Sequence, residues 1–489
     1  MTVVSTRLFF GALALSLLVQ APLRVSASQC ADLFADRTAT HTSQQIAGYL
    51  SGTKQSLEQM RGENALVADM VEIKSAANGT LRSIVINPNT SPTNIAVDLL
   101  VQVELAANPL AKARALKNIS GVLGTLETLN FHQATGLFFS RYVADKTSAV
   151  ADMSVSSIDN LHLAISLFTI RHEFAGTEIG DQAGRLYDRM DFSAYYNEAT
   201  GLIGGNLSYR NGKWTRDTYD FANLGSEARL LYSAGWAMGL FKDQQGNANF
   251  ISRALANIKA EVLSTKDGDI LKLWDGSAFQ MYFPKMFINE ELYSASLKKM
   301  YLALADYMVA EGTRRQLVVP AAHSPGVVPF AEAVAGASDI KYKDKSGIQA
   351  LVCSDNNDLK IPDLKRNWDS TFTPYAFFMA STSNPSKFMP LLDGAAKLMT
   401  GNQSLYSPLL GWMDGYEVTG VLKGEVVPAQ LSLNQGMIAL SLLQMQKIDG
   451  LSASSRALFA DPIIKARLMI FYQLFDRKLK EVSLRREHP

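Results

Sequence analysis

Pairs of amphipathic helices alternate with loops along most of this chain, and this alternation limits its fold more than any other feature. In the first pair, apolar residues recur at helical spacing over 92–105 and again over about 111–129, and Asn108-Pro109 separates the two helices. Similar helical patterns return over 156–190, 290–311, 374–399, 430–446 and 462–479. The intervening loops are rich in Trp, Tyr, Asp, Gly and Asn. This arrangement predicts an all-α fold, an α/α toroid in which helical hairpins form a ring and loops at one rim form a cleft.

Short non-helical segments are expected between these helices. An extended piece is predicted at 83–87, and a β-hairpin at 195–209, where glycines stand next to alternating Leu, Ile and Tyr. The segment 31–76 is predicted to be mainly helical, and 273–283 to be a loop at the rim. No Pro/Ser/Gly-rich linker divides the 489 residues, so a single domain over 28–489 is expected.

The first 27 residues have the pattern of a secretory signal peptide. Arg7 precedes an apolar run over 8–19, and small residues at 25–27 supply a cleavage site. That run is shorter than the roughly 20 residues that a transmembrane helix needs, so no stable membrane insertion is expected after cleavage. The sequence therefore predicts a periplasmic or secreted bacterial protein.

Charge and composition exclude some classes of partner and cofactor. With 47 basic and 46 acidic residues the net charge is +1, which gives no basic surface for nucleic acid. The 6 histidines are scattered without the spacing of metal ligands, so neither a metal nor an organic cofactor is expected. Cys30 and Cys353 are either a disulfide pair or two free thiols, and both readings stay open.

Glu227 is the main candidate for chemistry. Ser226 can cap the N-terminus of a helix, with Gly225 allowing a sharp turn before it. Leu231, Ala234 and Met238 continue a helical stripe from Glu227, which predicts that its carboxylate points inward. The alternative is an ordinary first-turn acid that complements the helix dipole.

Eight short stretches carry a family resemblance, in the family's order, over roughly residues 85–445. They are Ser91-Pro92-Thr93-Asn94-Ile95, Leu123-Gly124-Thr125-Leu126-Glu127-Thr128-Leu129, Gly136-Leu137-Phe138-Phe139, Ser157-Ile158-Asp159-Asn160, Met190-Asp191-Phe192, Tyr219-Asp220 with Ser226-Glu227-Ala228-Arg229-Leu230, Trp274-Asp275-Gly276-Ser277-Ala278-Phe279, and Asn434-Gln435-Gly436-Met437. At these stretches the chain resembles the bacterial glycoamylase-like proteins, which include the glucan-processing domain of cyclic β-1,2-glucan synthases and the endo-β-1,2-glucanases. The resemblance implies an α/α toroid that acts on β-linked glucans.

The resemblance also implies roles for individual residues. Glu227 matches a catalytic carboxylate, Asp355 resembles the second one, and Asp159 matches an acid that contacts substrate. Gln280 stands where several relatives place a carboxylate or another polar group, and the loop around Asp355 lacks most of the family's glycine and aromatic pattern. Glycoside hydrolysis needs one protonated carboxyl group and one ionised carboxylate, and Glu227 and Asp355 would supply them.

Further side chains are expected to bind sugar. Tryptophans can offer flat apolar faces to sugar rings, and polar side chains can bind hydroxyl groups. Arg229 has an alternative role, which is to pair with a nearby acid such as Asp220. The substrate-binding candidates are Asp159, Arg229, Trp274, Gln280, Asp369, Trp412, Glu417 and Gln435.

The sequence therefore predicts a glycoside hydrolase or transglycosylase that acts on an oligo- or polysaccharide, most simply a β-1,2-glucan. The alternative is a non-catalytic glycan-binding protein of the same fold.

Overall fold

The computed structural model describes residues 43–75, 81–145, 147–244, 247, 249–265, 268–273, 278–314, 371–397, 399–400, 403–417, 426–427, 429–447 and 449–487. The predicted signal peptide, both cysteines and Asp355 lie outside these ranges. Within them, no helix combines the length and the apolar character that a membrane span requires.

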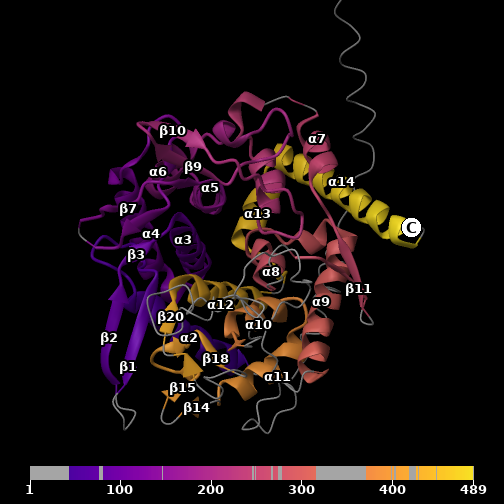
Figure 1. Ribbon diagram of the computed structural model, residues 1–489. Coiled ribbons are helices and arrows are strands. Elements are labelled where there is room, and N and C mark those ends of the chain that lie inside the picture. The colour runs from indigo at the N-terminus through magenta and orange to yellow at the C-terminus, as the bar shows by residue number, and fades with distance from the viewer. Residues whose placement is uncertain are drawn as a thin grey trace, which may run out of the picture.

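A ring of buried helical segments forms the middle of the molecule (Figure 1). Contacts run from α3 to α5, from α5 to η3, from α8 to α10, from α10 to α12, and from α12 back to α3. Hydrogen bonds from Arg229 to the carbonyl groups of Gln280 and Met281 connect the segment of η3 with α8. In the described part of the chain, the ring consists of α3 (Pro92–Ala106), α5 (Ser157–Glu173), η3 (Leu231–Gly235), α8 (Ala278–Phe287), α10 (Pro374–Ser381) and α12 (Ser432–Met445).

Burial distinguishes these inner helices from the outer ones. All residues of α3 and α10 are buried, as expected for helices that are enclosed on every side. On α4 the buried residues recur every three or four positions, at Ala115, Ile119, Val122 and Leu126 among others, which makes one apolar stripe. The outer helices are α2 (Ser43–Gln59), α4 (Pro109–Thr128), α6 (Glu178–Asp188), α7 (Phe250–Asn257), α9 (Ala295–Arg314), α11 (Pro385–Ala395), α13 (Ala453–Ala460) and α14 (Pro462–Glu487).

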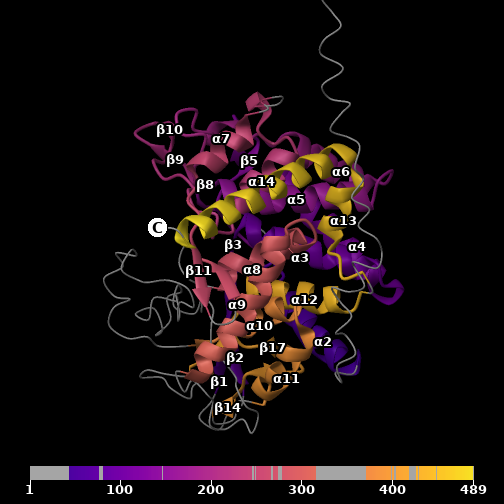
Figure 2. The same ribbon diagram turned by 90° about the vertical axis from the view of Figure 1, so that its right-hand side faces the viewer.

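Three of the six inner segments in the described structure pack against an outer helix that is close in sequence. α4 covers α3, α6 covers α5, and α11 covers α10. The ring closes between distant parts of the chain, because α2 packs on α12, and the two lie side by side in both views (Figure 2). This architecture is an α/α toroid, so the predicted fold is confirmed.

Small antiparallel sheets accompany the ring of helices. The three-stranded sheets have the orders β2-β1-β20, β10-β9-β8, β3-β6-β7 and β13-β18-β19. Their strands are β1 (Met70–Ser75), β2 (Leu81–Asn87), β20 (Ala429–Leu431), β8 (Val155–Ser156), β9 (Asn206–Arg210), β10 (Lys213–Arg216), β3 (Asn89–Thr90), β6 (Arg141–Val143), β7 (Val150–Asp152), β13 (Thr371–Phe372), β18 (Gly415–Glu417) and β19 (Val426–Val427). Two-stranded pairs join β4 (Phe131–His132) to β5 (Leu137–Phe138), β11 (Val262–Thr265) to β12 (Gly268–Leu271), β14 (Met399–Thr400) to β15 (Gln403–Ser404), and β16 (Tyr406–Ser407) to β17 (Gly411–Trp412).

Two local predictions need correction, and a third missed one hairpin. The segment from Met70 onward is strand β1 instead of helix, because it pairs with both β2 and the distant β20. Inside the hairpin predicted at 195–209, an isolated antiparallel bridge pairs Tyr196 with Ile203. A second hairpin follows it and joins β9 to β10, with Asn211 and Gly212 at positive φ in its turn. Residues from Ala278 onward form helix α8, not a loop. The extended piece at 83–87 is confirmed as part of β2.

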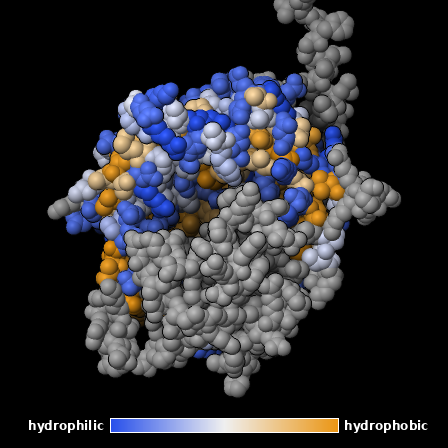
Figure 3. Space-filling view, in the orientation of Figure 1, coloured by the Kyte–Doolittle hydropathy of each residue, from blue (hydrophilic) through white to orange (hydrophobic). Residues whose placement is uncertain are grey.

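The surface in the orientation of Figure 1 is mostly hydrophilic over its upper half (Figure 3). An apolar strip follows β2 at the lower left, where Val85 and Ile86 are exposed. β2 is an edge strand of its sheet in the described structure, so one side of its backbone faces no further strand there.

Candidate functional site

The N-terminal ends of several inner helices meet at one end of the ring, which we call the rim. Thr93, in the first turn of α3, donates a hydrogen bond to Asp159 in the first turn of α5, at 2.5 Å. The backbone N–H of Glu227, just before η3, donates to Oε1 of Gln280 in the first turn of α8, at 2.9 Å. The carboxylate of Asp69 accepts a hydrogen bond from the first turn of α3, and its carbonyl oxygen accepts one from the first residue of α12. The rim therefore brings Asp159, Glu227 and Gln280 to the starts of inner helices.

Glu227 occupies a tightly built turn. As predicted, Ser226 caps the segment: its Oγ accepts a hydrogen bond from the backbone N–H of Ala228 at 3.2 Å. The chain then makes short turns and widens into the π-helical turn η3, a feature that is often found at functional sites. The side chain of Glu227 is half-buried, so it is neither packed in the core nor turned fully to solvent.

The sharp turn before Glu227 requires glycine, and this gives a first prediction. A Cβ atom at Gly225 would overlap the backbone carbonyl group of Lys272, which cannot move away as a flexible side chain could. We expect Gly225→Ala to destabilise the protein by about 1–3 kcal/mol and to lower activity by displacing Glu227. Chemical denaturation and activity assays measure the two effects.

The matched control is Gly124→Ala, in the middle of α4, where a Cβ would have nothing within 4 Å. Alanine is favoured over glycine inside helices, so this variant should gain about 0.5–1 kcal/mol. Equal stability for both alanine variants would contradict the proposed steric role of Gly225.

Arg229 fixes the backbone at Glu227 and at Gln280 together. Its Nη1 donates to the carbonyl oxygen of Ser226 at 3.2 Å and to that of Gln280 at 2.7 Å. Its Nη2 donates to the carbonyl oxygen of Met281 at 2.6 Å. The side chain of Arg229 is fully buried, so these contacts argue against the predicted contact with substrate. Arg229 instead holds the backbone of residues at the rim in place.

The counter-ion of Arg229 is Glu290, which comes from the turn before α9. Nη2 of Arg229 lies 2.7 Å from Oε2 of Glu290, and both side chains have no exposed surface. Glu290 also accepts hydrogen bonds from the hydroxyl groups of Tyr301, at 2.6 Å, and Tyr472, at 3.2 Å. Burial alone would lower the pKa of Arg229, but the charge of Glu290 raises it above its usual value. The suggested partner Asp220 pairs with Arg216 instead.

Asp159 is held by a short chain of polar contacts. It is half-buried in the first turn of α5, where Ser156 caps the helix by accepting from the backbone N–H of Asp159. Thr93 donates to Oδ1 of Asp159, and the same hydroxyl oxygen lies 3.0 Å from Nδ1 of His162. The pKa of His162 is lowered to about 3 because burial disfavours the charged imidazolium.

Gln435 and Trp412 lie beneath the rim in the core. Nε2 of Gln435 donates to the carbonyl oxygen of Trp412 at 2.5 Å. The indole ring of Trp412 is fully buried and packs against Tyr49, Phe378 and Tyr406. Because neither Trp412 nor Gln435 offers surface to a sugar, their burial argues against the predicted contact with substrate.

The remaining candidates cannot be placed around this rim. Asp355, Trp274 and Asp369 lie outside the described residues. Glu417 is described only by its backbone, which pairs with Thr371 between β18 and β13. In the described part of the chain, no group of three or more His, Cys, Asp or Glu side chains is arranged to hold a metal ion.

Sequence reasoning missed three residues that the structure places under the site: Thr93, His162 and Glu290. His162 follows Asp159 by three residues on a predicted helix, a spacing that puts two side chains on one face. The sequence alone therefore indicates that these two side chains lie together. Thr93 stands in the stretch Ser91-Pro92-Thr93-Asn94 that opens α3. Glu290 is 61 residues from Arg229 and had no local signal.

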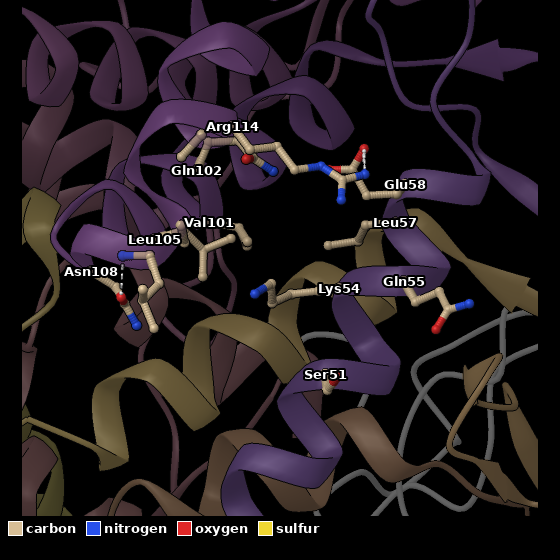
Figure 4. A pocket seen from close by; sticks show the side chains of 13 residues that line it. Ser51, Lys54, Gln55, Leu57, Glu58, Val101, Gln102, Leu105, Asn108 and Arg114 are labelled. Carbon is tan, nitrogen blue, oxygen red and sulfur yellow. Dashed lines mark hydrogen bonds and ion pairs between the residues drawn. The ribbon is translucent and has the colours of Figure 1, made fainter.

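A separate pocket of about 700 Å³ lies between α2, α3 and α4 (Figure 4). Leu57, Val101 and Leu105 form apolar parts of its wall, and Lys54 points into it. From α3, the pocket is lined by Val101, Gln102 and Leu105 in the C-terminal half of the helix, whereas Thr93 stands at its N-terminal end. It is therefore distinct from the rim site.

Comparisons with known proteins identify the fold. No protein-family model matches the sequence, and no curated protein matches it. The endo-β-1,2-glucanase from Chitinophaga pinensis, solved in complex with sophorotriose and glucose, has a TM-score of 0.62 and 12% identity, over 88% of this chain and 98% of that chain. The endo-β-1,2-glucanase from Talaromyces funiculosus, solved with sophorose, has a TM-score of 0.62 and 11% identity, over 91% and 93%.

The β-1,2-glucanase from Parabacteroides distasonis also has a TM-score of 0.62, with 12% identity, over 89% of this chain and 60% of that chain. At such low identities the likeness concerns the arrangement of the helices. The chain thus has the α/α toroid fold of these glucanases.

Proposed function

We propose that this protein is an exported glycoside hydrolase or transglycosylase that acts on a β-glucan, with β-1,2-glucan as the substrate to test first. The observation that carries the proposal is the half-buried carboxylate of Glu227, which stands at the rim beside Gln280 on a backbone fixed by Arg229. The glucanases of the same fold support the choice of substrate. Export would use residues 1–27, and residues 28–489 would act as one domain.

In the proposed mechanism, Glu227 is the general acid that protonates the leaving glycosidic oxygen. Asp355 is the second carboxylate, which activates water or attacks the sugar. Asp159, with one oxygen held by Thr93, accepts a hydrogen bond from a substrate hydroxyl. The backbone contact with Gln280 and the buried Arg229 keep Glu227 in place, so less reorganisation is needed when substrate binds.

The test is incubation of the purified protein with linear β-1,2-glucan, and in parallel with β-1,3-, β-1,4- and α-1,4-glucans. Mass spectrometry and anion-exchange chromatography detect the products. We expect shorter oligosaccharides from the β-1,2-glucan and little or no product from the other three. Turnover of another glucan alone would overturn the substrate assignment, and the absence of both turnover and binding would overturn the proposal.

A non-catalytic glycan-binding protein is the second candidate. It is favoured by Gln280, an amide at a position where several proteins of the family that this chain resembles carry a carboxylate or another polar group. Calorimetry with β-1,2-glucan separates the two: saturable binding without any product favours the binding protein. A Glu-to-Gln mutant of the Talaromyces funiculosus glucanase was solved with β-1,2-glucan, so in that protein such a substitution is compatible with a bound glucan.

A further inference from the structure

Three side chains from two inner helices form a continuous contact at the rim. Asp159 and His162 are one helical turn apart on α5, and Thr93 of α3 lies between them. The hydroxyl oxygen of Thr93 is 2.5 Å from Oδ1 of Asp159 and 3.0 Å from Nδ1 of His162. Thr93 and His162 are buried, whereas Asp159 is half-buried. The chain of hydrogen bonds thus extends from the buried His162 to the half-buried Asp159.

Counting protons fixes the direction of both hydrogen bonds. A carboxylate can only accept, so the single hydroxyl proton of Thr93 goes to Asp159. The oxygen of Thr93 must then accept from His162, which places the imidazole proton on Nδ1. The other ring nitrogen, Nε2, is buried and has no hydrogen-bond partner in the described structure. A proton there would lack an acceptor, so the neutral Nδ1–H form is favoured.

The surroundings of His162 hold the ring still. It lies against two phenyl rings of α8, with centroid distances of 5.0 Å to Phe283 and 4.6 Å to Phe287. The ring is nearly parallel to that of Phe287, at 16°. Among the side-chain hydrogen bonds of the described structure, the one charged partner of Thr93 is Asp159, and His162 bonds only to Thr93 through its ring. The imidazole is therefore a rigid, neutral donor.

We propose that His162 and Thr93 are positioning residues that hold the carboxylate of Asp159 in one orientation for a substrate hydroxyl group. Oδ1 is occupied by Thr93, and Oδ2 makes no hydrogen bond within the described part of the chain, so Oδ2 is the oxygen that receives the substrate. This inference rests on the proposed function for the substrate, but the orientation of Asp159 does not depend on it. Holding the side chain before binding avoids part of the entropy cost of ordering it.

The experiment compares Thr93→Val, which removes the hydroxyl group at nearly constant shape, with Thr93→Ser, which keeps it. Thr169→Val is the matched control, because Thr169 is a buried threonine of α5 whose hydroxyl donates only to the carbonyl oxygen of Ile165. Crystal structures should show Asp159 in one rotamer in the wild type, Thr93→Ser and Thr169→Val, and in more than one in Thr93→Val. A single unchanged rotamer in Thr93→Val would overturn the proposal.

Nitrogen NMR of protein labelled at histidine tests the proton assignment. The resonances of His162 should show a proton on Nδ1 and no titration down to about pH 4, since its pKa is about 3. A proton on Nε2, or titration near the usual pKa of histidine, would overturn it. Neither this measurement nor the crystal structures need glucan, so they stand even if the protein proves inactive.

Where the wild type does turn over glucan, Thr93→Val should raise KM about tenfold and change kcat less, because a charge-assisted contact to the substrate is lost. Thr93→Ser should restore KM to within about twofold. A KM for Thr93→Val that equals that of Thr169→Val would show that the orientation of Asp159 does not serve substrate binding.

Discussion

Glu290→Gln is expected to lower the free energy of unfolding by about 3–5 kcal/mol, because it leaves the guanidinium group of Arg229 buried without a counter-ion. Both side chains of this ion pair have no exposed surface. Glutamine keeps the shape of the side chain, so the loss reports on charge rather than on packing. Urea denaturation, followed by fluorescence and by circular dichroism, measures the change in midpoint.

The matched control is Glu127→Gln, which breaks an ion pair at the surface. Arg185 and Glu127 lie 2.9 Å apart, with 61% and 36% of their side chains exposed. Water screens this pair, so the expected loss is below about 1 kcal/mol. Similar losses for the two glutamine variants would refute the view that the buried pair depends on charge compensation.

Loss of Glu290 should also affect the rim. Arg229 donates to the carbonyl oxygen of Ser226, the residue before Glu227, and to the carbonyl oxygen of Gln280. It therefore holds the backbone on both sides of the hydrogen bond between Glu227 and Gln280. If the guanidinium group shifts, both sides of this contact shift with it. The folded fraction of Glu290→Gln should therefore be less active per molecule than the wild type, whereas Glu127→Gln should keep full specific activity.

Local signals in the sequence are enough to predict the helical hairpins. The pair α3 and α4 is predicted from apolar residues at helical spacing and from the break at Asn108-Pro109. In the structure Ser91 and Asn108 cap the two helices, and a proline follows each cap. Asn211-Gly212 is an equally local signal for the hairpin of β9 and β10, which lies beyond most of the segment predicted at 195–209. Caps and turns depend on neighbouring residues, so they can be read from the chain.

Pairings between distant segments could not be read in this way. β1 was taken for helix because its apolar residues continue those of α2, yet it is a strand that pairs with β20 more than three hundred residues later. The partner of Arg229 is Glu290 and not the nearby Asp220, which has its own partner in Arg216. In each case the structure is decided by tertiary contacts that compete with a plausible local alternative.

The rim follows from the alternation of helices and loops, but the roles of Asp159 and Gln280 come only from the resemblance. The structure places Glu227, Asp159 and Gln280 at the starts of inner helices, and their roles stay predictions. Their neighbours Thr93 and His162 were overlooked, because a lone histidine in a sequence is more often a core residue than part of a site. The polar contact of His162 with Thr93 appears only when α3 and α5 are packed together.

Glu227→Gln is expected to lower kcat on β-1,2-glucan by about 10²–10⁴-fold, because the amide cannot donate a proton to the leaving oxygen. The fold should be preserved. The interaction between Glu227 and Gln280 uses the backbone N–H of Glu227, which the substitution does not change. The stability of this half-buried position should therefore change by less than about 1 kcal/mol.

Binding and pH dependence separate a chemical role for Glu227 from a structural one. Glu227→Gln should bind β-1,2-glucan nearly as tightly as the wild type, measured by calorimetry, while turnover is lost. A general acid must be protonated to act, so the wild-type rate should fall at alkaline pH, and the residual rate of the variant should lack this fall. Glu198→Gln is the matched control, since Glu198 is an exposed acid of the loop between η2 (Ser193–Tyr195) and β9. Unchanged kcat in Glu227→Gln, or an equal loss in both variants, would remove Glu227 from the mechanism and assign the general acid to another residue.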